Sequence, residues 1–304
     1  MLYKSVYLNL LSQFEKLSSH NRQGSYKTKA RYAEAFKRFL AFLAEKFHLE
    51  KLANVAPKHL LAYVDYLTEK GLSAAYIKTE LSAIRFFHDQ IPKPRYTLPD
   101  NSALDLQRRR FGGVDRTWST PEFNWFVAKA LNLDYDDYAA ILCLGRYAAL
   151  RIHECFRLDT AAAEKALKTG LLTVKGKGGL VREVPINDSI RATLRDILKV
   201  TPRGQKLFVA PGDKTHLAIH RLESFINYYQ GKNPWVRSSR PITFHGLRHT
   251  CAAEWYDGFL RQGCSELEAR KRVSKLLGHT RDDVTRIYLA SRLDGGRGDP
   301  SASE

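Results

Sequence analysis

The sequence has few cysteines and no long apolar run, and each absence excludes a class of protein. It holds four cysteines in 304 residues, none of them in CxxC spacing. Cysteines this sparse do not form the disulfide framework of a small secreted protein, so we expect free thiols and a cytoplasmic location. No apolar stretch approaches the roughly 18 residues that a transmembrane helix needs, and the amphipathic N-terminus does not resemble a cleaved signal. We therefore expect no membrane association.

Two signatures of cofactor binding are missing as well. The segment 175–179 reads Lys-Gly-Lys-Gly-Gly, which lacks the G-x4-G-K-[ST] order of a phosphate-binding P-loop. No cluster of carboxylates typical of a magnesium site stands out in the sequence. We therefore expect neither a nucleotide cofactor nor a metal.

What the sequence does contain is positive charge, with a formal net charge of +17. Residues 1–110 hold 19 Lys and Arg against 10 Asp and Glu, and residues 111–304 hold 30 against 22. Basic surfaces attract nucleic acid because neutralising its phosphates releases condensed counterions. A basic surface that only aids solubility is the alternative. Because both halves are basic, the charge favours a protein whose two parts touch the same DNA.

The length and the pattern of apolar residues predict two domains. Residues 1–91 show helical spacing of apolar residues, most clearly from Tyr26 to Phe47, and predict an all-α domain. Residues 92–117 are rich in Pro, Gly and Arg without sustained periodicity, and predict a basic linker.

The second predicted domain covers residues 118–293. Thr120-Pro121-Glu122 is typical of a helix start, and most of the following sequence is helical in pattern. The exception is residues 171–186, where two apolar runs flank the glycine-rich segment and predict a β-hairpin. Residues 294–304 are expected to be disordered. The predicted fold class is therefore mainly α, of the α+β type, with a small β-hairpin in a mostly α second domain.

Five short segments carry the residues best suited to catalysis. His245 and Arg248 stand three apart and share a face if their segment is helical. The other segments, in chain order, are Ala149–Glu154 with Arg151 and Glu154, the hairpin with Lys177, Leu277–His279, and Arg286–Tyr288. Each is weak alone, because an isolated tyrosine is usually a core aromatic and an Arg and Glu three apart are often a plain ion pair.

Together, in this order and spacing, the segments resemble the tyrosine recombinase (phage integrase) family. The family pattern is an Arg followed three residues later by an acid, a hairpin Lys, His-x-x-Arg, Leu-Gly-His, and a Tyr nine residues after that His. The resemblance is tight from Ala149 to Tyr288. Over residues 1–91 it rests on length and helical pattern, and implies the family's SAM-like core-binding domain.

Three features depart from the family pattern. Ala-Ala-Leu precedes Arg151 where Thr-Gly-Leu is common, and 31 residues separate Arg248 from His279, more than the pattern predicts. Only 16 residues follow Tyr288. Family members often pass a C-terminal helix to a neighbouring subunit, so this short tail leaves that route of assembly open.

The resemblance implies a site-specific DNA recombinase or integrase that works through a 3′-phosphotyrosyl intermediate, without metal or ATP. Tyr288 would be the nucleophile. Arg151 and Arg248 would bind the nonbridging oxygens of the phosphate with permanently charged, planar guanidiniums. His245 and His279 would line the phosphate, one as base or proton relay and the other as hydrogen-bond donor, with the division between them open.

Two further roles are implied by the same resemblance. Lys177 would protonate the leaving 5′ oxygen, with Lys175 as the competing candidate. Glu154 would orient Arg151 or another residue at the phosphate rather than react.

The implied partners are double-stranded DNA and further copies of the chain, as a homotetramer on two DNA sites. Accessory DNA-bending proteins and association with the nucleoid are expected too. An integrase of a mobile element is favoured over a chromosome-dimer resolvase.

Three other functions remain open. The first is a noncatalytic DNA-binding regulator on the same fold, and the second is a type IB topoisomerase that relaxes DNA. The third is a metal hydrolase with His245, His249 and His279 as zinc ligands.

Overall fold

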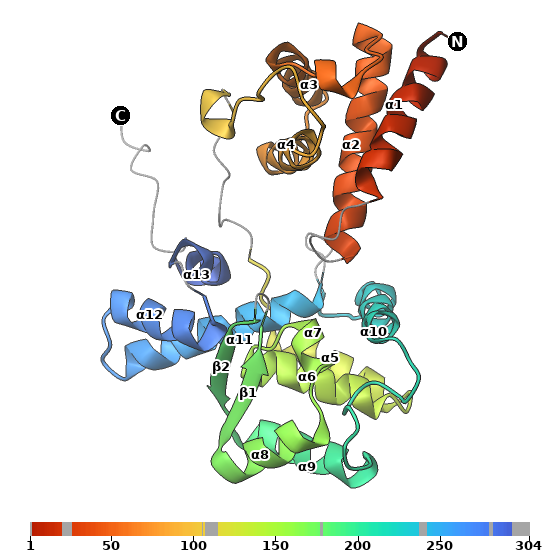
Figure 1. Ribbon diagram of the computed structural model, residues 1–304. Helices are drawn as coiled ribbons and strands as arrows, with labels where there is room; N and C mark the ends of the chain where they lie inside the picture. Colours follow the sequence, from red (N-terminus) through yellow and green to blue (C-terminus); the bar gives the residue numbers. More distant parts are fainter. Residues whose placement is uncertain are drawn as a thin grey trace, which may run out of the picture. The chain divides into compact units, whose positions relative to one another are not determined.

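The computed structural model describes residues 2–19, 26–104, 106, 115–176, 179–236, 242–279 and 282–293. The chain divides into two compact units, Met1–Arg109 and Arg110–Glu304 (Figure 1). Residues 107–114 of the expected linker and the expected disordered tail, residues 294–304, lie outside the described residues. The boundaries of the expected domains stay predictions.

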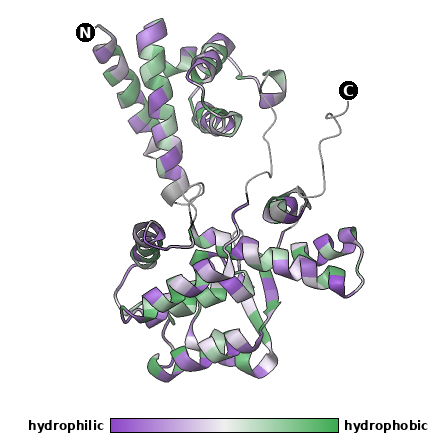
Figure 2. Cartoon of the chain, turned by 180° about the vertical axis from the view of Figure 1, so that it is seen from behind, coloured by the Kyte–Doolittle hydropathy of each residue, from purple (hydrophilic) through white to green (hydrophobic). Residues whose placement is uncertain are grey.

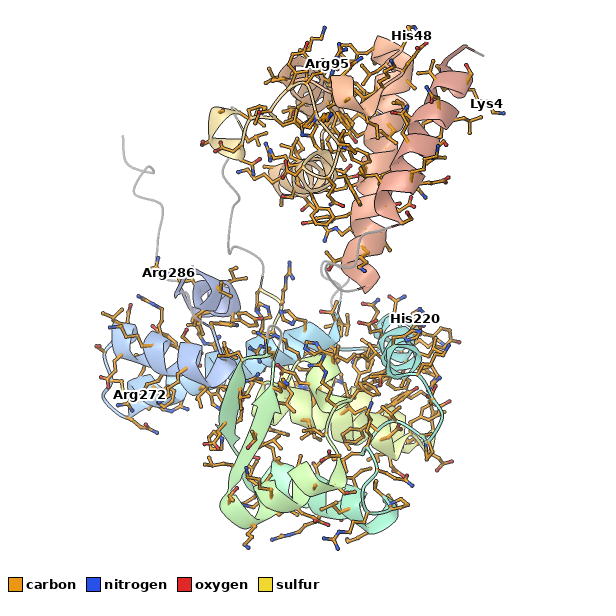
Figure 3. The ribbon with its side chains drawn as sticks, viewed as in Figure 1. Lys4, His48, Arg95, His220, Arg272 and Arg286 are labelled. Carbon is orange, nitrogen blue, oxygen red and sulfur yellow. The ribbon has the colours of Figure 1, made fainter. Side chains whose placement is uncertain are left out.

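Unit 1 is helical. Its elements are α1 (Leu2–Ser18), α2 (Tyr26–Phe47), η1 (Leu52–Asn54), α3 (Pro57–Glu69), α4 (Ala74–His88) and η2 (Asn101–Ala103). Pro57 begins α3, where its missing N–H has no partner to lose, and the Ser73 hydroxyl accepts from the Tyr76 backbone to begin α4. Helices α1 and α2 run antiparallel side by side, so that Lys4 and His48 lie at one end of the pair (Figure 3).

The core of unit 1 combines aliphatic side chains with a group of packed aromatic rings. Phe14 of α1 packs edge-on against Phe87 of α4, and Phe36 of α2 contacts both rings. Figure 2 shows polar and apolar residues interspersed along these helices, which is the pattern of helices with one buried face. The stretch after α4 belongs to this core as well, since Leu104 is buried in it and Arg85 binds the backbone oxygen of Pro99. Residues 92–104 therefore pack on unit 1, although their composition is that of a linker.

Unit 2 surrounds a small β-hairpin with helices (Figure 1). Its elements are α5 (Thr120–Leu131), α6 (Asp136–Ala148), α7 (Ile152–Cys155), α8 (Thr160–Thr169), β1 (Leu171–Lys175), β2 (Val181–Pro185), α9 (Asp188–Val200), α10 (Thr215–Gln230), α11 (Phe244–Arg261), α12 (Glu266–Leu277), α13 (Asp282–Tyr288) and α14 (Ala290–Leu293). Strands β1 and β2 pair antiparallel, with Val174 opposite Arg182. The predicted mainly α fold with one small hairpin is confirmed.

The long segment between Arg248 and His279 forms two packed helices. Helix α11 continues to Arg261 and α12 packs against it. Ala269 and Val273 of α12 are buried against Tyr256 of α11. This segment therefore adds buried residues of α12 to the core of unit 2.

Helix α11 is held at its start by the residues that lead into unit 2. The indole Nε1 of Trp118 donates to the backbone oxygen of Thr243 at 2.9 Å, and the Trp118 backbone N–H donates to the Thr250 hydroxyl at 2.7 Å. Only glycine fits at position 246, because a Cβ there would lie 2.4 Å from the Arg116 backbone oxygen. The start of α11 and residues 116–118 are thus packed backbone against backbone.

In the described ranges, no helix combines the length and the apolar character needed to cross a membrane.

We predict that Gly246→Ala destabilises unit 2 by about 1–3 kcal/mol, because the added methyl group overpacks a backbone contact. Gly231→Ala is the matched control, since Gly231 has a helical φ of −73° and nothing within 4 Å of an added Cβ. Thermal unfolding followed by near-ultraviolet circular dichroism compares the two variants with the parent chain. Equal melting temperatures for the two variants would contradict the prediction.

Candidate active site

The start of α11 presents three side chains toward the same region. His245 and Arg248 lie one turn apart, as do His245 and His249, whose rings meet edge to face at 5.1 Å. Arg248 is fully buried, with none of its surface exposed. Helical spacing therefore brings His245 and Arg248 together as expected.

Tyr288, at the end of α13, lies among these side chains. Its ring stacks on His249 with centroids 4.4 Å apart and an interplanar angle of 24°. The ring centroids of His279 and His245 are 5.0 and 5.3 Å away, and Cζ of Arg248 lies 5.4 Å from the centre of the tyrosine ring. Tyr288 is only 7% exposed. A phenol, three imidazoles and a guanidinium thus share one site.

Two backbone carbonyls hold the Arg248 guanidinium. Nη1 donates to the oxygen of Ala149, and Nη2 donates to that of Leu277 at 2.6 Å. Ala149 ends α6 in the left-handed conformation, with a φ of 49°, which costs a non-glycine residue about 1 kcal/mol or more. This is the position where the family pattern commonly has glycine. The turn directs the Ala149 carbonyl to Arg248 and leads the chain into Arg151.

His279 is held between Arg248 and Thr285. Nη2 of Arg248 lies 3.4 Å from Nε2 of His279, and Nδ1 of His279 lies 3.1 Å from the Thr285 hydroxyl. A guanidinium can only donate, so we assign the acceptor role to Nε2 and the proton to Nδ1. Thr285 is fully buried. Helix α13 therefore contributes a support for His279 as well as Tyr288.

Arg151 and Glu154 bound the short helix α7. The Glu154 carboxylate accepts from the Arg151 backbone N–H at 2.7 Å and from Nη1 of Arg151 at 2.9 Å. It also accepts two hydrogen bonds from Arg182 of β2, both at 2.8 Å. Burial opposes ionisation of Glu154, but the hydrogen bonds and charge of Arg182, followed by those of Arg151, lower its pKa to about 2. The carboxylate is ionised at neutral pH.

Positive charge and burial keep the imidazoles neutral. Burial first, then Arg248 and other cations, lower the pKa of His245 to about 4 and that of His279 to about 3. Burial and His245 lower the pKa of His249 to about 3. Arg151 lowers the pKa of Arg248, His245 and His279, so its charge acts at the same site. An anion is what this electrostatic environment favours.

The two candidate lysines are placed differently. Lys177 lies outside the described residues. Gly176, directly before it, is close to the site, because a Cβ there would lie 3.4 Å from Oε1 of Glu154 and 3.7 Å from Nη1 of Arg151. Lys175 is exposed at the end of β1. The choice between the two lysines stays a prediction.

A zinc site built on His245, His249 and His279 receives no support. Over the described part of the chain, no three His, Cys, Asp or Glu side chains are grouped to hold a metal ion.

Sequence reasoning missed several residues of the site. Arg182 had a usable signal, since strand alternation puts it on the same face as the core residue Val184. His249 was weighed only as a metal ligand, although four-residue spacing places it beside His245. Arg116, whose charge lowers the pKa of His245 and His249, had no signal, because it lies at the end of an aperiodic segment. Thr285 had none either.

The residues of this site from Arg151 to Tyr288 lie within a match to a known family. The model of the phage integrase family matches residues 126–293, and that of the phage integrase N-terminal SAM-like domain matches residues 11–91. The tyrosine recombinase XerD of Caulobacter vibrioides is 26% identical over 292 residues, which cover 90% of this chain and 89% of the relative.

Two solved structures share the fold. A lambda integrase dimer bound to a COC′ core site has a TM-score of 0.67 at 18% identity, covering 97% of this chain and 98% of that one. A lambda integrase tetramer bound to a Holliday junction has a TM-score of 0.60 at 17% identity, covering 96% and 79%.

We predict that acidification destabilises unit 2 through its buried imidazoles. The unfolded pKa of His249 is near 6.5 and the folded pKa about 3, so between these values the unfolded chain binds more protons and stability falls as pH falls. From about pH 7.5 to about pH 5 this one group removes up to about 2 kcal/mol.

Replacement of His249 by phenylalanine keeps a stacked ring that cannot be protonated. His249→Phe should therefore lose less stability than the parent chain over this pH interval. Denaturant unfolding at several pH values measures the difference, and parallel curves for the two proteins would refute the assignment.

Proposed function

Because the chain belongs to the phage integrase family of tyrosine recombinases, we propose that it is a site-specific recombinase that cuts and rejoins double-stranded DNA through a covalent bond between Tyr288 and a phosphate. The observation that carries the proposal is the position of the Tyr288 ring. Its centre lies 5.4 Å from Cζ of Arg248, 5.3 Å from the ring centre of His245 and 5.0 Å from that of His279. A phenol next to a guanidinium and neutral imidazoles is suited to phosphoryl transfer.

In the proposed reaction, Arg248 and Arg151 bind the nonbridging oxygens of the scissile phosphate. Attack by a phenol creates a five-coordinate phosphorane with added negative charge on these oxygens, and guanidiniums neutralise it with charge-assisted hydrogen bonds. Two permanent cations supply the charge stabilisation that a metal ion provides in other phosphoryl-transfer enzymes. We therefore propose a reaction without metal or ATP.

Tyr288 attacks phosphorus and gives up its phenolic proton. We assign acceptance of this proton to His245, which is neutral and lies beside the ring. His279 faces Arg248 through Nε2, where a nonbridging oxygen held by Arg248 would accept a hydrogen bond after a change of tautomer. A bound phosphate raises the pKa of both imidazoles, so they become better proton acceptors only when substrate is in place.

The bond from phosphorus to the 5′ oxygen breaks as the 3′-phosphotyrosyl bond forms. We propose that Lys177 protonates this oxygen, because the preceding residue, Gly176, lies close to Arg151 and Glu154 and a lysine ammonium on a long side chain can donate a proton. A free 5′ hydroxyl of another strand then attacks the phosphotyrosyl bond and releases Tyr288. The bond energy is kept throughout, so no external energy source is required.

DNA binding must also uncover Arg248. Its side chain has no exposed surface and lies under the ring of Tyr288. We propose that Tyr288 and α13 shift when DNA enters, so that the guanidinium and the phenolic oxygen both reach the phosphate.

The proposed partners are double-stranded DNA and further copies of the chain, as a tetramer on two DNA sites. The net charge of +17 supports binding to DNA, and basic side chains such as Arg286 of α13 lie on the surface of unit 2 (Figure 3). The lambda integrase structures, a dimer on a core site and a tetramer on a Holliday junction, support the assembly. Accessory DNA-bending proteins, nucleoid association and the role of a mobile-element integrase stay predictions.

We predict a covalent protein–DNA adduct that depends on Tyr288. The substrates are 5′-labelled duplexes, selected for binding from a random-sequence library. Each carries a nick, and the position of the nick is varied across the site, so that cleavage close to the nick releases a short fragment that diffuses away. Denaturing gels should show a labelled protein band with the parent chain and none with Tyr288→Phe. The adduct should form in EDTA as well.

The same experiment separates the alternatives. Adduct that persists in Tyr288→Phe would rule out this nucleophile, and adduct lost in EDTA would indicate a metal-dependent reaction. A noncatalytic regulator would bind the duplex equally well with either residue at 288 and form no adduct.

We predict that Arg151→Gln slows cleavage by about 10²- to 10³-fold. This corresponds to a rise of roughly 3–4 kcal/mol in the activation free energy, which is typical of losing one oxyanion donor. Affinity for the duplex should change little, because one phosphate contact of many is lost. Arg272→Gln, which removes an exposed cation of α12, is the control and should cleave at close to the parent rate. Single-turnover cleavage of the nicked duplex measures both, and a small effect of Arg151→Gln would exclude Arg151 from the site.

A further inference from the structure

Arg182 is a buried cation that the proposed reaction does not use. It lies on the inward face of β2 and is 7% exposed. Its two Nη atoms each donate to a different oxygen of Glu154 at 2.8 Å. This two-pronged geometry orients the carboxylate as well as neutralising it.

Glu154 in turn orients Arg151. Its Oε1 accepts from both Arg182 and Arg151, and its Oε2 accepts from Arg182 and from the Arg151 backbone N–H. One carboxylate thus fixes both the backbone and the guanidinium of Arg151. Arg151 itself is half-buried, and among the described residues Glu154 is the partner that holds its guanidinium.

Arg182 also contacts the turn that carries His279. Gly278 ends α12 with a φ of 66°, and a Cβ there would lie 3.0 Å from Cδ of Arg182. The charge of Arg182 lowers the pKa of His279 and of Arg248. The stem of the arginine therefore packs behind the Gly278–His279 backbone while its head binds Glu154.

The β-hairpin lies close to Glu154 and Arg151 as well. Arg182 pairs with Val174 across the sheet, and Gly176 at the end of β1 approaches Glu154 and Arg151. Through the Arg182 side chain, β2 thus meets α7 and the turn after α12, and the end of β1 approaches the same Glu154.

A purely structural ion pair is the competing explanation, and unit 2 contains one for comparison. Arg146 of α6 is as buried as Arg182 and forms a two-pronged pair with Glu254 of α11. Glu254 is half exposed, however, and within the described residues its carboxylate accepts hydrogen bonds from Arg146. Glu154 is 1% exposed and shared with Arg151. A second buried cation next to Arg248 and Arg151 also adds like-charge repulsion, which a pair serving the core alone would not require.

We propose that Arg182 is a positioning residue, which acts through Glu154 to hold the Arg151 guanidinium at the scissile phosphate and through Gly278 to support His279. This inference rests on the proposed function. It predicts that loss of Arg182 impairs the neutralisation of phosphate charge, without Arg182 itself touching DNA.

The test compares two substrates that differ in phosphate charge. One is the nicked duplex, and the other carries a methyl group in place of one nonbridging oxygen at the cleaved position, which removes the negative charge that Arg151 neutralises. The proteins are the parent chain, Arg182→Gln, Arg182→Lys and the matched control Arg146→Gln. Single-turnover cleavage, duplex affinity and melting temperature are measured for each.

With the ordinary phosphate, Arg182→Gln should cleave about 10- to 100-fold more slowly than the parent, as is common when a supporting partner is removed. With the methyl-bearing phosphate this deficit should shrink to within about 3-fold, because a misplaced Arg151 matters less when there is less charge to bind. The cleavage rate of Arg182→Lys should lie between those of Arg182→Gln and the parent chain, since an ammonium keeps the charge and binds one oxygen. For Arg146→Gln, the cleavage rate relative to that of the parent chain should be the same on both substrates.

An equal deficit of Arg182→Gln on both substrates, or no deficit, overturns the proposal. If the melting curve shows that Arg182→Gln does not fold, the two substrates are compared with Arg182→Lys instead, and the same outcomes support or overturn the proposal. Failure of the proposed function looks different, because then the parent chain itself forms no adduct with either substrate.

Discussion

The concentration of positive charge around Tyr288 is the constraint on which the rest of unit 2 depends. Burial lowers the pKa of Arg248, and the charges of Arg151 and Arg182 lower it further. Arg151 and Arg182 both form ion pairs with the carboxylate of Glu154. Such a site is costly to assemble in a protein interior. The histidines contribute no further charge, since burial and the arginines keep them neutral. A site of this kind favours the binding of an anion.

Several segments of the chain must meet for this arrangement to exist. Helix α11 supplies His245 and Arg248, the turn after α6 supplies a carbonyl for Arg248, and the turn after α12 supplies another. The packed pair α11 and α12 brings the second turn back to the first. Ala149 shows the cost of this geometry, because it adopts a left-handed conformation that glycine would reach without strain, while its methyl group is buried beside Tyr288.

The fold class and the family could be predicted from the sequence. Helical periodicity gave the helices of both units, and the glycine-rich segment between apolar runs indicated the hairpin. The spacing of His245 and Arg248 placed them on one face, and the resemblance to tyrosine recombinases, now confirmed, brought Tyr288 and His279 to the same site. Strand alternation marks Arg182 as inward-facing, but its role depends on Glu154, 28 residues earlier in a different element. Thr285 and Arg116 left no local signal, because their part in the site depends on residues far away in the sequence.

The contact between residues 116–118 and α11 joins the first described residues of unit 2 to the candidate site. Trp118 and the Arg116 backbone pack against Gly246, which stands between His245 and Arg248 in the helix. A displacement of residues 116–118 would therefore be transmitted to the turn of α11 that carries those two side chains.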